Sequence, residues 1–223
     1  YKRQSVDSGF DGSYDLIKAY EEEDADFHQV VADMAGIPRS QAKTINLGLF
    51  YGMGSGKLAK QLGIEVEQAK RILAEYNAKV PFVKQLSNRC MATEDRKGCV
   101  VTIRGRHCRF DRWEPKSFGI HKSMTRDEAE SKYDRGMIKR AMTYKALNRL
   151  IQGSAADQTK QAMIDCYNTG HRPLLQIHDE LCFNVGKDED IKEVKNKMEH
   201  CLDNVPMKVC LLYTSDAADD SLR

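Results

Sequence analysis

The sequence predicts an α+β fold, in which a cluster of helices is followed by a β-hairpin and a further helix. Two observations lead to this prediction. Apolar residues recur at helical spacing through most of the first half of the chain, between glycines and prolines that end each segment. After Pro173 the pattern changes to short apolar runs on either side of His178-Asp179, which is typical of two strands joined by a tight turn.

The first half of the chain is expected to be helical. Pro38 suits the first turn of one helix, because its missing N–H would have no helical partner there, and Gly52 and Gly54 supply a stop. Glycine and proline also separate the other helical segments. The expected helices span residues 13–24, 26–35, 38–51, 57–62, 66–79 and 82–93.

The second half is expected to mix strands and helices. Apolar runs on either side of Arg104-Gly105-Arg106 predict a short hairpin with a basic, glycine-centred turn. The polar stretch 111–126 is expected to be irregular. The expected elements are strands 99–103 and 107–110, helices 128–147 and 154–167, strands 174–177 and 180–185, a helix 189–202 and a strand 205–209.

Composition limits the class of protein. The 223 residues carry a net charge of +2 and contain no apolar run near the ~20 residues of a membrane span, so we expect a soluble protein without a membrane partner. The seven cysteines lack the spacing of a zinc site and are expected to be reduced thiols in a cytoplasmic setting. Residues 132–149 hold six basic residues against the single acid Asp134; a solvated helix face and a phosphate-contacting helix explain this equally well.

Arg39, Lys43, Leu47 and Tyr51 follow one another at steps of four within the expected helix 38–51. Side chains at this spacing share one face of a helix. Two cations followed by an apolar side chain and a ring suit a triphosphate at one end and a sugar and base at the other. The alternative, which the stripe alone favours, is an ordinary surface helix with solvated cations and with the leucine and tyrosine in the core.

The dyad His178-Asp179 and the adjacent Glu180 place two carboxylates at the tip of the expected hairpin. A turn exposes neighbouring side chains while the flanking strands hold them in place, which suits a divalent metal ion. A merely hydrophilic turn is the commoner explanation for such a tripeptide.

Taken together and in order, five motifs resemble those of the family A DNA polymerases, the polymerase I-like and phage-type class. Arg39, Lys43 and Tyr51-Gly52 resemble the family's motif B, and His178-Asp179-Glu180 resembles its motif C. The other three are Asp26-Phe27-His28, Gly105-Arg106 and the run Gln152-Gly153-Ser154-Ala155-Ala156-Asp157. The resemblance covers about residues 12–209 and implies a fingers subdomain over 1–125 and part of a palm subdomain over 126–209.

The resemblance implies a role for each nucleotide-binding residue. His28, Arg39 and Lys43 would contact the incoming triphosphate, and Lys43 would also assist departure of pyrophosphate. Leu47 would lie at the sugar, where the family commonly has Phe or Tyr, so we expect altered discrimination among sugar analogues. Tyr51 would stack beside the templating base.

The resemblance also implies catalytic and DNA-binding residues. Asp179 would be a ligand of two Mg²⁺ ions, and Glu180 a nearby carboxylate that assists them. The DNA contacts would come from Asn148 and Gln152 in the minor groove, His178 at the primer end, and Arg106 with the basic helix on phosphates. The implied partners are primer-template DNA and deoxynucleoside triphosphates. Replication accessory proteins and a proofreading exonuclease stay open.

Several features of the chain depart from the family pattern. Nothing in residues 1–15 resembles motif A, whose aspartate is the other metal ligand, so we expect a fragment truncated at both ends that does not polymerise DNA alone. Residues 210–223 resemble a translated sequencing adaptor, an authentic divergent tail being the alternative.

The short Gly36-Ile37-Pro38 link favours a bacteriophage source, and hence the cytoplasm of an infected or bacterial cell. Two rival functions stay open. One is a single-subunit RNA polymerase, against which Glu180 argues because that class has Ser there. The other is a non-catalytic nucleic-acid-binding module.

Overall fold

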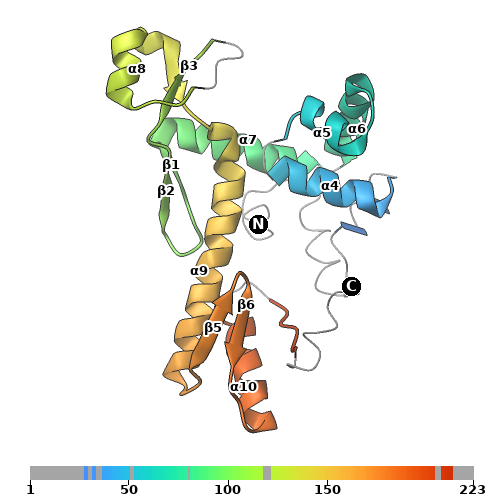
Figure 1. Ribbon diagram of the computed structural model, residues 1–223, viewed down its shortest axis with the longest axis vertical. Helices are drawn as coiled ribbons and strands as arrows, with labels where there is room; N and C mark the ends of the chain where they lie inside the picture. Colours follow the sequence, from blue (N-terminus) through green and yellow to red (C-terminus); the bar gives the residue numbers. More distant parts are fainter. Residues whose placement is uncertain are drawn as a thin grey trace. The chain divides into compact units, whose positions relative to one another are not determined.

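A computed structural model of the chain describes residues 28–29, 32–33, 37–50, 53–79, 81–117, 122–203 and 207–212 (Figure 1). They belong to two compact units, Tyr1–Gly153 and Ser154–Arg223. The described residues form helices and three two-stranded antiparallel sheets. The α+β prediction is therefore confirmed. The fingers and palm boundaries stay predictions, as does the origin of residues 210–223.

The helices between residues 39 and 97 agree closely with the sequence prediction. They are α4 (Arg39–Phe50), α5 (Ser55–Leu62), α6 (Val66–Lys79) and α7 (Pro81–Lys97). His28, Gln29, Ala32 and Asp33 are also helical, as expected for 26–35, whereas the expected helix 13–24 and Tyr51 lie outside the described residues. Helix α7 continues four residues beyond the expected end and stops before Gly98, whose φ of +72° is the left-handed conformation that favours glycine after a helix.

One apolar core joins these helices. Ile45 of α4, Leu58 of α5, Tyr76 of α6 and Phe82 of α7 are each at most 1% exposed and belong to a single cluster. Burial of side chains of this size stabilises the unit by roughly 1.5–3 kcal/mol each. The cluster also takes in Ala32, which fixes the segment that carries His28 against α4 and α6.

A second cluster joins α7 to the hairpin formed by β1 (Cys99–Val101) and β2 (His107–Arg109). Gly105 lies in the turn with φ of +82°, as the glycine-centred turn predicted. Leu147 and Leu150 of α9 (Ala146–Asn168) complete this cluster. The hairpin is consequently held against the first turns of α9.

The region between this hairpin and α9 contradicts the sequence prediction. A single helix over 128–147 was expected, but α8 spans only Arg126–Lys132 and the strand β4 (Ile138–Arg140) pairs with β3 (Trp113–Pro115), inside the stretch expected to be irregular. Thr125 and Glu128 form a capping box that starts α8 early. The remaining elements are the 3₁₀ helices η1 (Arg135–Met137) and η2 (Thr143–Lys145).

Burial explains this outcome. Ile138 packs with Met124 and Ala129 in a small core that Trp113 and Tyr133 border. A helix through residue 138 would break the β3–β4 pairing and this core with it, so tertiary contacts override the local helical pattern. The basic residues of 132–149 consequently do not share one helix, and the expected basic helix is wrong.

Helix α9 also differs from its expected bounds. It begins at Ala146 instead of residue 154 and runs through Gly153 without a break; the boundary between the two units falls after this glycine. Glycine weakens a helix by only about 1 kcal/mol relative to alanine, so its presence does not end one.

The second unit holds the C-terminal half of α9, the hairpin of β5 (Pro173–Ile177) and β6 (Glu180–Phe183), and α10 (Asp188–Glu199). Ala162, Cys201 and Leu202 form its core, with Leu181 and Met198 packed against them. The hairpin is confirmed. Part of the strand expected over 205–209 lies outside the described residues, and the described part, 207–209, is not a strand.

Two further expectations concern the whole chain. All seven cysteines lie in the described part and are free. Over the same described part, no helix combines the length and the apolar character that crossing a membrane requires.

Candidate active site

Helix α4 presents a cationic face. Arg39, Lys43 and Leu47 are exposed, Leu47 by 44%, whereas Ala42, Ile45 and Asn46 on the opposite face are almost completely buried. The alternative in which Leu47 is a core residue is therefore wrong. The first turn of α4 holds no acidic residue, so its two cations add to the positive end of the helix dipole. This face can attract an anion at its N-terminal half and contact an apolar or ring surface further along.

The structure brings His28 against the same helix. Asn46 Nδ2 lies 3.2 Å from His28 Nδ1, and Tyr76 donates a 2.5 Å hydrogen bond to Asn46 Oδ1. Burial raises the pKa of the Tyr76 hydroxyl far above its ordinary value, so this group is a hydrogen-bond donor at any pH at which the protein functions. Tyr51, the fourth residue of the predicted stripe, lies outside the described residues.

The second predicted site is in the other unit, at the tip of the β5–β6 hairpin. Ile177 pairs with Glu180, which leaves His178 and Asp179 as a two-residue turn. His178, Asp179 and Glu180 are all exposed. His178 has φ of +54°, a left-handed conformation that is uncommon outside glycine and that often marks functional turns.

Asp179 and Glu180 are the donors available for a divalent cation. Nowhere in the described part do three or more His, Cys, Asp or Glu residues lie together in a way that could hold a metal ion. Mg²⁺, however, is usually bound by one or two carboxylates together with substrate phosphates and water. Two adjacent exposed carboxylates fit that requirement.

Glu180 has a neighbour that the sequence did not indicate. The thiol of Cys182 donates a hydrogen bond of 3.5 Å to Glu180 Oε1. Partial desolvation, and then the hydrogen bond and charge of Glu180, raise the pKa of the Cys182 thiol. Cys182 therefore stays protonated and orients one oxygen of Glu180.

The predicted DNA-binding residues of the first unit lie together. Asn148 and Gln152 are one turn apart on α9 and both reach the surface, with Leu147 and Leu150 buried behind them. Arg106 Nη2 donates a 2.7 Å hydrogen bond to the carbonyl of Gly153, the residue after Gln152. His178, the remaining predicted DNA-binding residue, belongs to the second unit.

Several cations of 132–149 have structural partners. Arg140 donates 2.8 Å to the carbonyl of Phe110 and lies 4.9 Å above the ring of Trp113. Arg149 lies 4.3 Å above the Phe110 ring. These guanidinium groups hold the β1–β2 hairpin and the β3–β4 strand pair in place. Neither a solvated helix face nor a phosphate-contacting helix describes this role.

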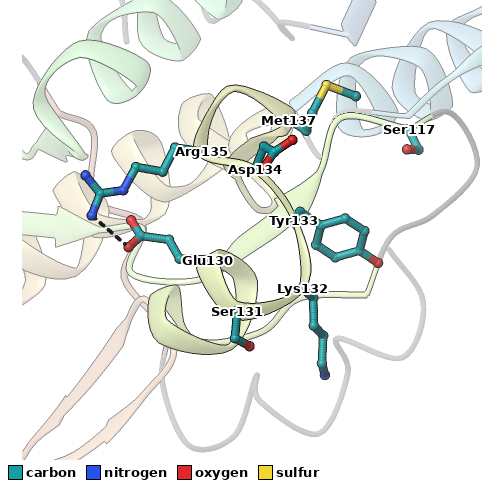
Figure 2. A pocket seen from close by; sticks show the side chains of 8 residues that line it. All are labelled: Ser117, Glu130, Ser131, Lys132, Tyr133, Asp134, Arg135 and Met137. Carbon is teal, nitrogen blue, oxygen red and sulfur yellow. Dashed lines mark hydrogen bonds and ion pairs between the residues drawn. The ribbon is translucent and has the colours of Figure 1, made fainter.

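A hollow of about 640 Å³ lies at the end of α8 (Figure 2). Figure 2 shows the Glu130–Arg135 ion pair on one side of it and the Tyr133 ring on another. Its lining residues are Ser117, Glu130, Ser131, Lys132, Tyr133, Asp134, Arg135 and Met137. None of them is a predicted site residue, so this hollow does not define the nucleotide site.

Sequence reasoning gave no role to four residues that support the site: Asn46, Tyr76, Gly153 and Cys182. Asn46 carried a signal, because it is a polar residue at a position of α4 that the helical period places on the buried face. Gly153 is the contact point between α9 and the β1–β2 hairpin, since a Cβ there would lie 2.7 Å from Thr102 Cγ2. The sequence around Tyr76 predicts a buried aromatic residue and does not indicate its hydrogen bond to Asn46.

Comparison with known proteins agrees with these features. A solved structure, the POL domain of Pol1 from M. smegmatis in complex with DNA primer-template and dNTP, matches 87% of this chain with a TM-score of 0.68 and 31% sequence identity, and the match covers 34% of that chain. The fold, the exposed cationic helix and the carboxylate-bearing hairpin thus define a segment of a nucleic-acid polymerase domain.

The sequence comparisons name the particular family. The family model for DNA polymerase family A matches residues 9–220. The DNA-directed DNA polymerase of Pseudomonas phage M6 is 35% identical over 219 residues, and DNA polymerase I of Pseudomonas aeruginosa is 32% identical over 180 residues. This chain belongs to DNA polymerase family A. The matches cover 82% and 74% of the chain and span 30% and 18% of the phage and bacterial relatives.

Proposed function

We propose that the protein containing this chain is a template-directed DNA polymerase, which transfers a deoxynucleotide to the 3′-hydroxyl of a primer. The observation that best supports this is the exposed face of α4, where Arg39, Lys43 and Leu47 project from a helix whose other face is locked into the core. A triphosphate needs fixed, converging positive charge, and a helix anchored over its whole buried face supplies it.

In the proposed reaction the primer oxygen attacks the α-phosphorus, a new P–O bond forms, and the bond to pyrophosphate breaks. Arg39 and Lys43 hold the β- and γ-phosphates, and Lys43 donates a proton or a hydrogen bond to the departing pyrophosphate oxygen. His28 contacts the same phosphates from beside α4. Leu47 lies against the sugar, and Tyr51 stacks beside the templating base.

Asp179 and Glu180 are proposed to hold Mg²⁺ at the hairpin tip. When bound, two such ions lower the pKa of the primer hydroxyl and stabilise charge on the attacking and leaving oxygens. Cys182 contributes by orienting a Glu180 oxygen through its 3.5 Å hydrogen bond.

Primer-template DNA is the proposed macromolecular partner. Asn148 and Gln152 would accept the primer terminus through minor-groove contacts, where every base pair offers similar acceptors, so pairing is sensed without reading sequence. Arg106 would contact phosphate near them, and His178 would lie at the primer end. Accessory replication proteins are left open. The cytoplasm of a bacterial or phage-infected cell is the proposed location, which the seven free thiols support.

The function can be tested in a chimera in which this chain replaces the matching segment of the Pseudomonas phage M6 polymerase. We expect the chimera to extend a primer with deoxynucleotides. Lys43→Ala should lower kcat/KM by about 10²–10³-fold, as loss of one charge-stabilising donor does, and Asp179→Asn should abolish extension. The matched control is Lys70→Ala, which removes an exposed lysine of α6 that pairs with Glu67.

Other outcomes would favour the rival functions. A folded chimera that binds primer-template but extends nothing would contradict the proposal and support a non-catalytic binding module. Extension with ribonucleotides in preference to deoxynucleotides would support the RNA polymerase alternative. Equal losses in Lys43→Ala and Lys70→Ala would show that α4 has no special role.

A further inference from the structure

The polar contacts between α4, α6 and the segment of His28 form a single directed chain. Tyr76 and Asn46 are 1% and 0% exposed, and Asn46 is the polar residue through which the chain passes. The hydrogen bonds run from the Tyr76 hydroxyl to Asn46 Oδ1, at 2.5 Å, and from Asn46 Nδ2 to His28 Nδ1, at 3.2 Å. A buried polar network of this kind is stable only if each donor faces an acceptor.

The direction of this chain follows from Tyr76. Its hydroxyl is buried and protonated, and Asn46 presents its amide oxygen to it, so Tyr76 donates and Asn46 Oδ1 accepts. That choice turns the amide nitrogen of Asn46, which can only donate, toward His28. Nδ1 of His28 must then be the acceptor and carries no proton, so the imidazole proton resides on Nε2.

We propose that Asn46 and Tyr76 are positioning residues that fix the tautomer of His28 and so direct an Nε2–H donor toward the triphosphate of the incoming nucleotide. This inference rests on the function proposed above, since the assignment of His28 to the triphosphate comes from it. The tautomer itself does not rest on it, because it follows from the two hydrogen bonds of the Asn46 amide.

The reverse orientation of the Asn46 amide would leave the buried Tyr76 hydroxyl without this acceptor. If Asn46 flipped, its oxygen would face His28 and favour a proton on Nδ1, while its nitrogen would face the Tyr76 oxygen and the buried hydroxyl proton would lose this acceptor. The nitrogen and the oxygen of the Asn46 amide thus each contact a side chain from a different segment. Tyr76 lies on α6 and Asn46 on α4, so the packing of those two helices sets the chemistry of a side chain on a third segment.

The first test measures the tautomer directly in the full 223-residue chain. Long-range ¹H–¹⁵N correlation spectra distinguish a protonated from an unprotonated imidazole nitrogen, and the resonances of His28 are identified by their loss in His28→Gln. We expect an unprotonated Nδ1 and a protonated Nε2 in the wild type at pH 8. A proton on Nδ1 would overturn the proposal whether or not the chain belongs to an active polymerase.

Two variants test the positioning roles. Tyr76→Phe keeps the ring and removes only the hydroxyl, so Asn46 is free to flip and we expect a mixture of the two His28 tautomers. Asn46→Asp places only acceptors beside Nδ1, and we expect Nδ1 to become protonated. Circular dichroism checks that each variant is folded. An unchanged Nδ1-unprotonated tautomer in both folded variants would overturn the roles of Asn46 and Tyr76.

The link to nucleotide is tested separately in the chimera described above. With Tyr76→Phe we expect KM for the deoxynucleotide to rise by up to about tenfold, the factor worth ~1.4 kcal/mol of one hydrogen bond, with kcat changed less. His28→Gln should give a similar rise, and combining the two should add little. A confirmed tautomer with an unchanged KM in Tyr76→Phe would overturn the link, whereas an inactive wild-type chimera would contradict the proposed function instead.

Discussion

Arg106 and Gly153 are joined by a 2.7 Å hydrogen bond from the Arg106 guanidinium to the Gly153 carbonyl, across 47 residues of sequence. The contact fastens the turn of the β1–β2 hairpin to the helix that carries Asn148 and Gln152. It depends on close approach, because a Cβ at position 153 would meet Thr102 Cγ2 at 2.7 Å and Cys108 Sγ at 3.4 Å. The glycine therefore serves the packing of the β1–β2 hairpin against α9.

Gly153→Ala should destabilise the chain in spite of alanine's better helix propensity. Propensity alone favours alanine by about 1 kcal/mol, whereas overpacking against backbone-anchored neighbours typically costs about 1–3 kcal/mol. We expect a net loss of roughly 1 kcal/mol in urea unfolding. Thr102→Ser removes the methyl group that the new Cβ would meet, so the double variant should recover part of the loss, and no recovery would contradict this explanation.

Leu47 should govern discrimination between sugars. It is exposed on the face of α4 that we propose binds the nucleotide, and it has neither ring nor hydroxyl. We expect Leu47→Tyr to change the ratio of dideoxynucleotide to deoxynucleotide incorporation in the chimera, while Leu47→Met, which keeps the apolar character, leaves the ratio close to that of the wild type. Identical ratios in all three would show that this side chain does not contact the sugar.

His178 should tolerate glycine better than a β-branched residue. Its φ of +54° is accessible to glycine without strain, whereas a left-handed conformation costs other residues about 1–2 kcal/mol. We expect His178→Gly to change the free energy of unfolding by less than about 1 kcal/mol and His178→Val to lower it by about 1–2 kcal/mol. Equal effects of the two substitutions would mean that the turn does not require this conformation.

Glu94 should make stability fall as the pH rises through mildly acidic values. Its carboxyl is completely buried, both oxygens lack a hydrogen-bond partner, and Arg140 Nε lies 3.8 Å away. Burial raises its pKa from 4.5 to about 6, with Arg140 opposing the rise. The folded chain therefore binds a proton that the unfolded chain has released between these values, and stability is lost as pH rises across this window.

The expected size of this effect is on the order of 1 kcal/mol. Urea unfolding of the wild type and of Glu94→Gln at pH 4.5 and pH 7 measures it, because glutamine removes the titrating group and keeps the shape. A decline of stability in the wild type that is absent from Glu94→Gln is the expected result. The same decline in both would assign it to other groups.

The sequence by itself determined the elements whose signal is local. Helix α6 has the bounds that its pattern of apolar residues predicts, and the hairpin around His178-Asp179 lies between the two strands expected there. The stripe of Arg39, Lys43 and Leu47 was likewise readable, because spacing along one helix fixes which side chains share a face. The family resemblance followed from these same local motifs.

Tertiary structure alone decided what depends on partners distant in sequence. The β3–β4 pairing replaced an expected helix because Ile138 gains a core with Met124 and Ala129 that no local pattern encodes. The tautomer that we propose for His28 depends on Asn46, 18 residues away, and on Tyr76, 30 residues from Asn46. Burial turns such contacts into strong constraints, since a polar group removed from water must find its partner within the fold.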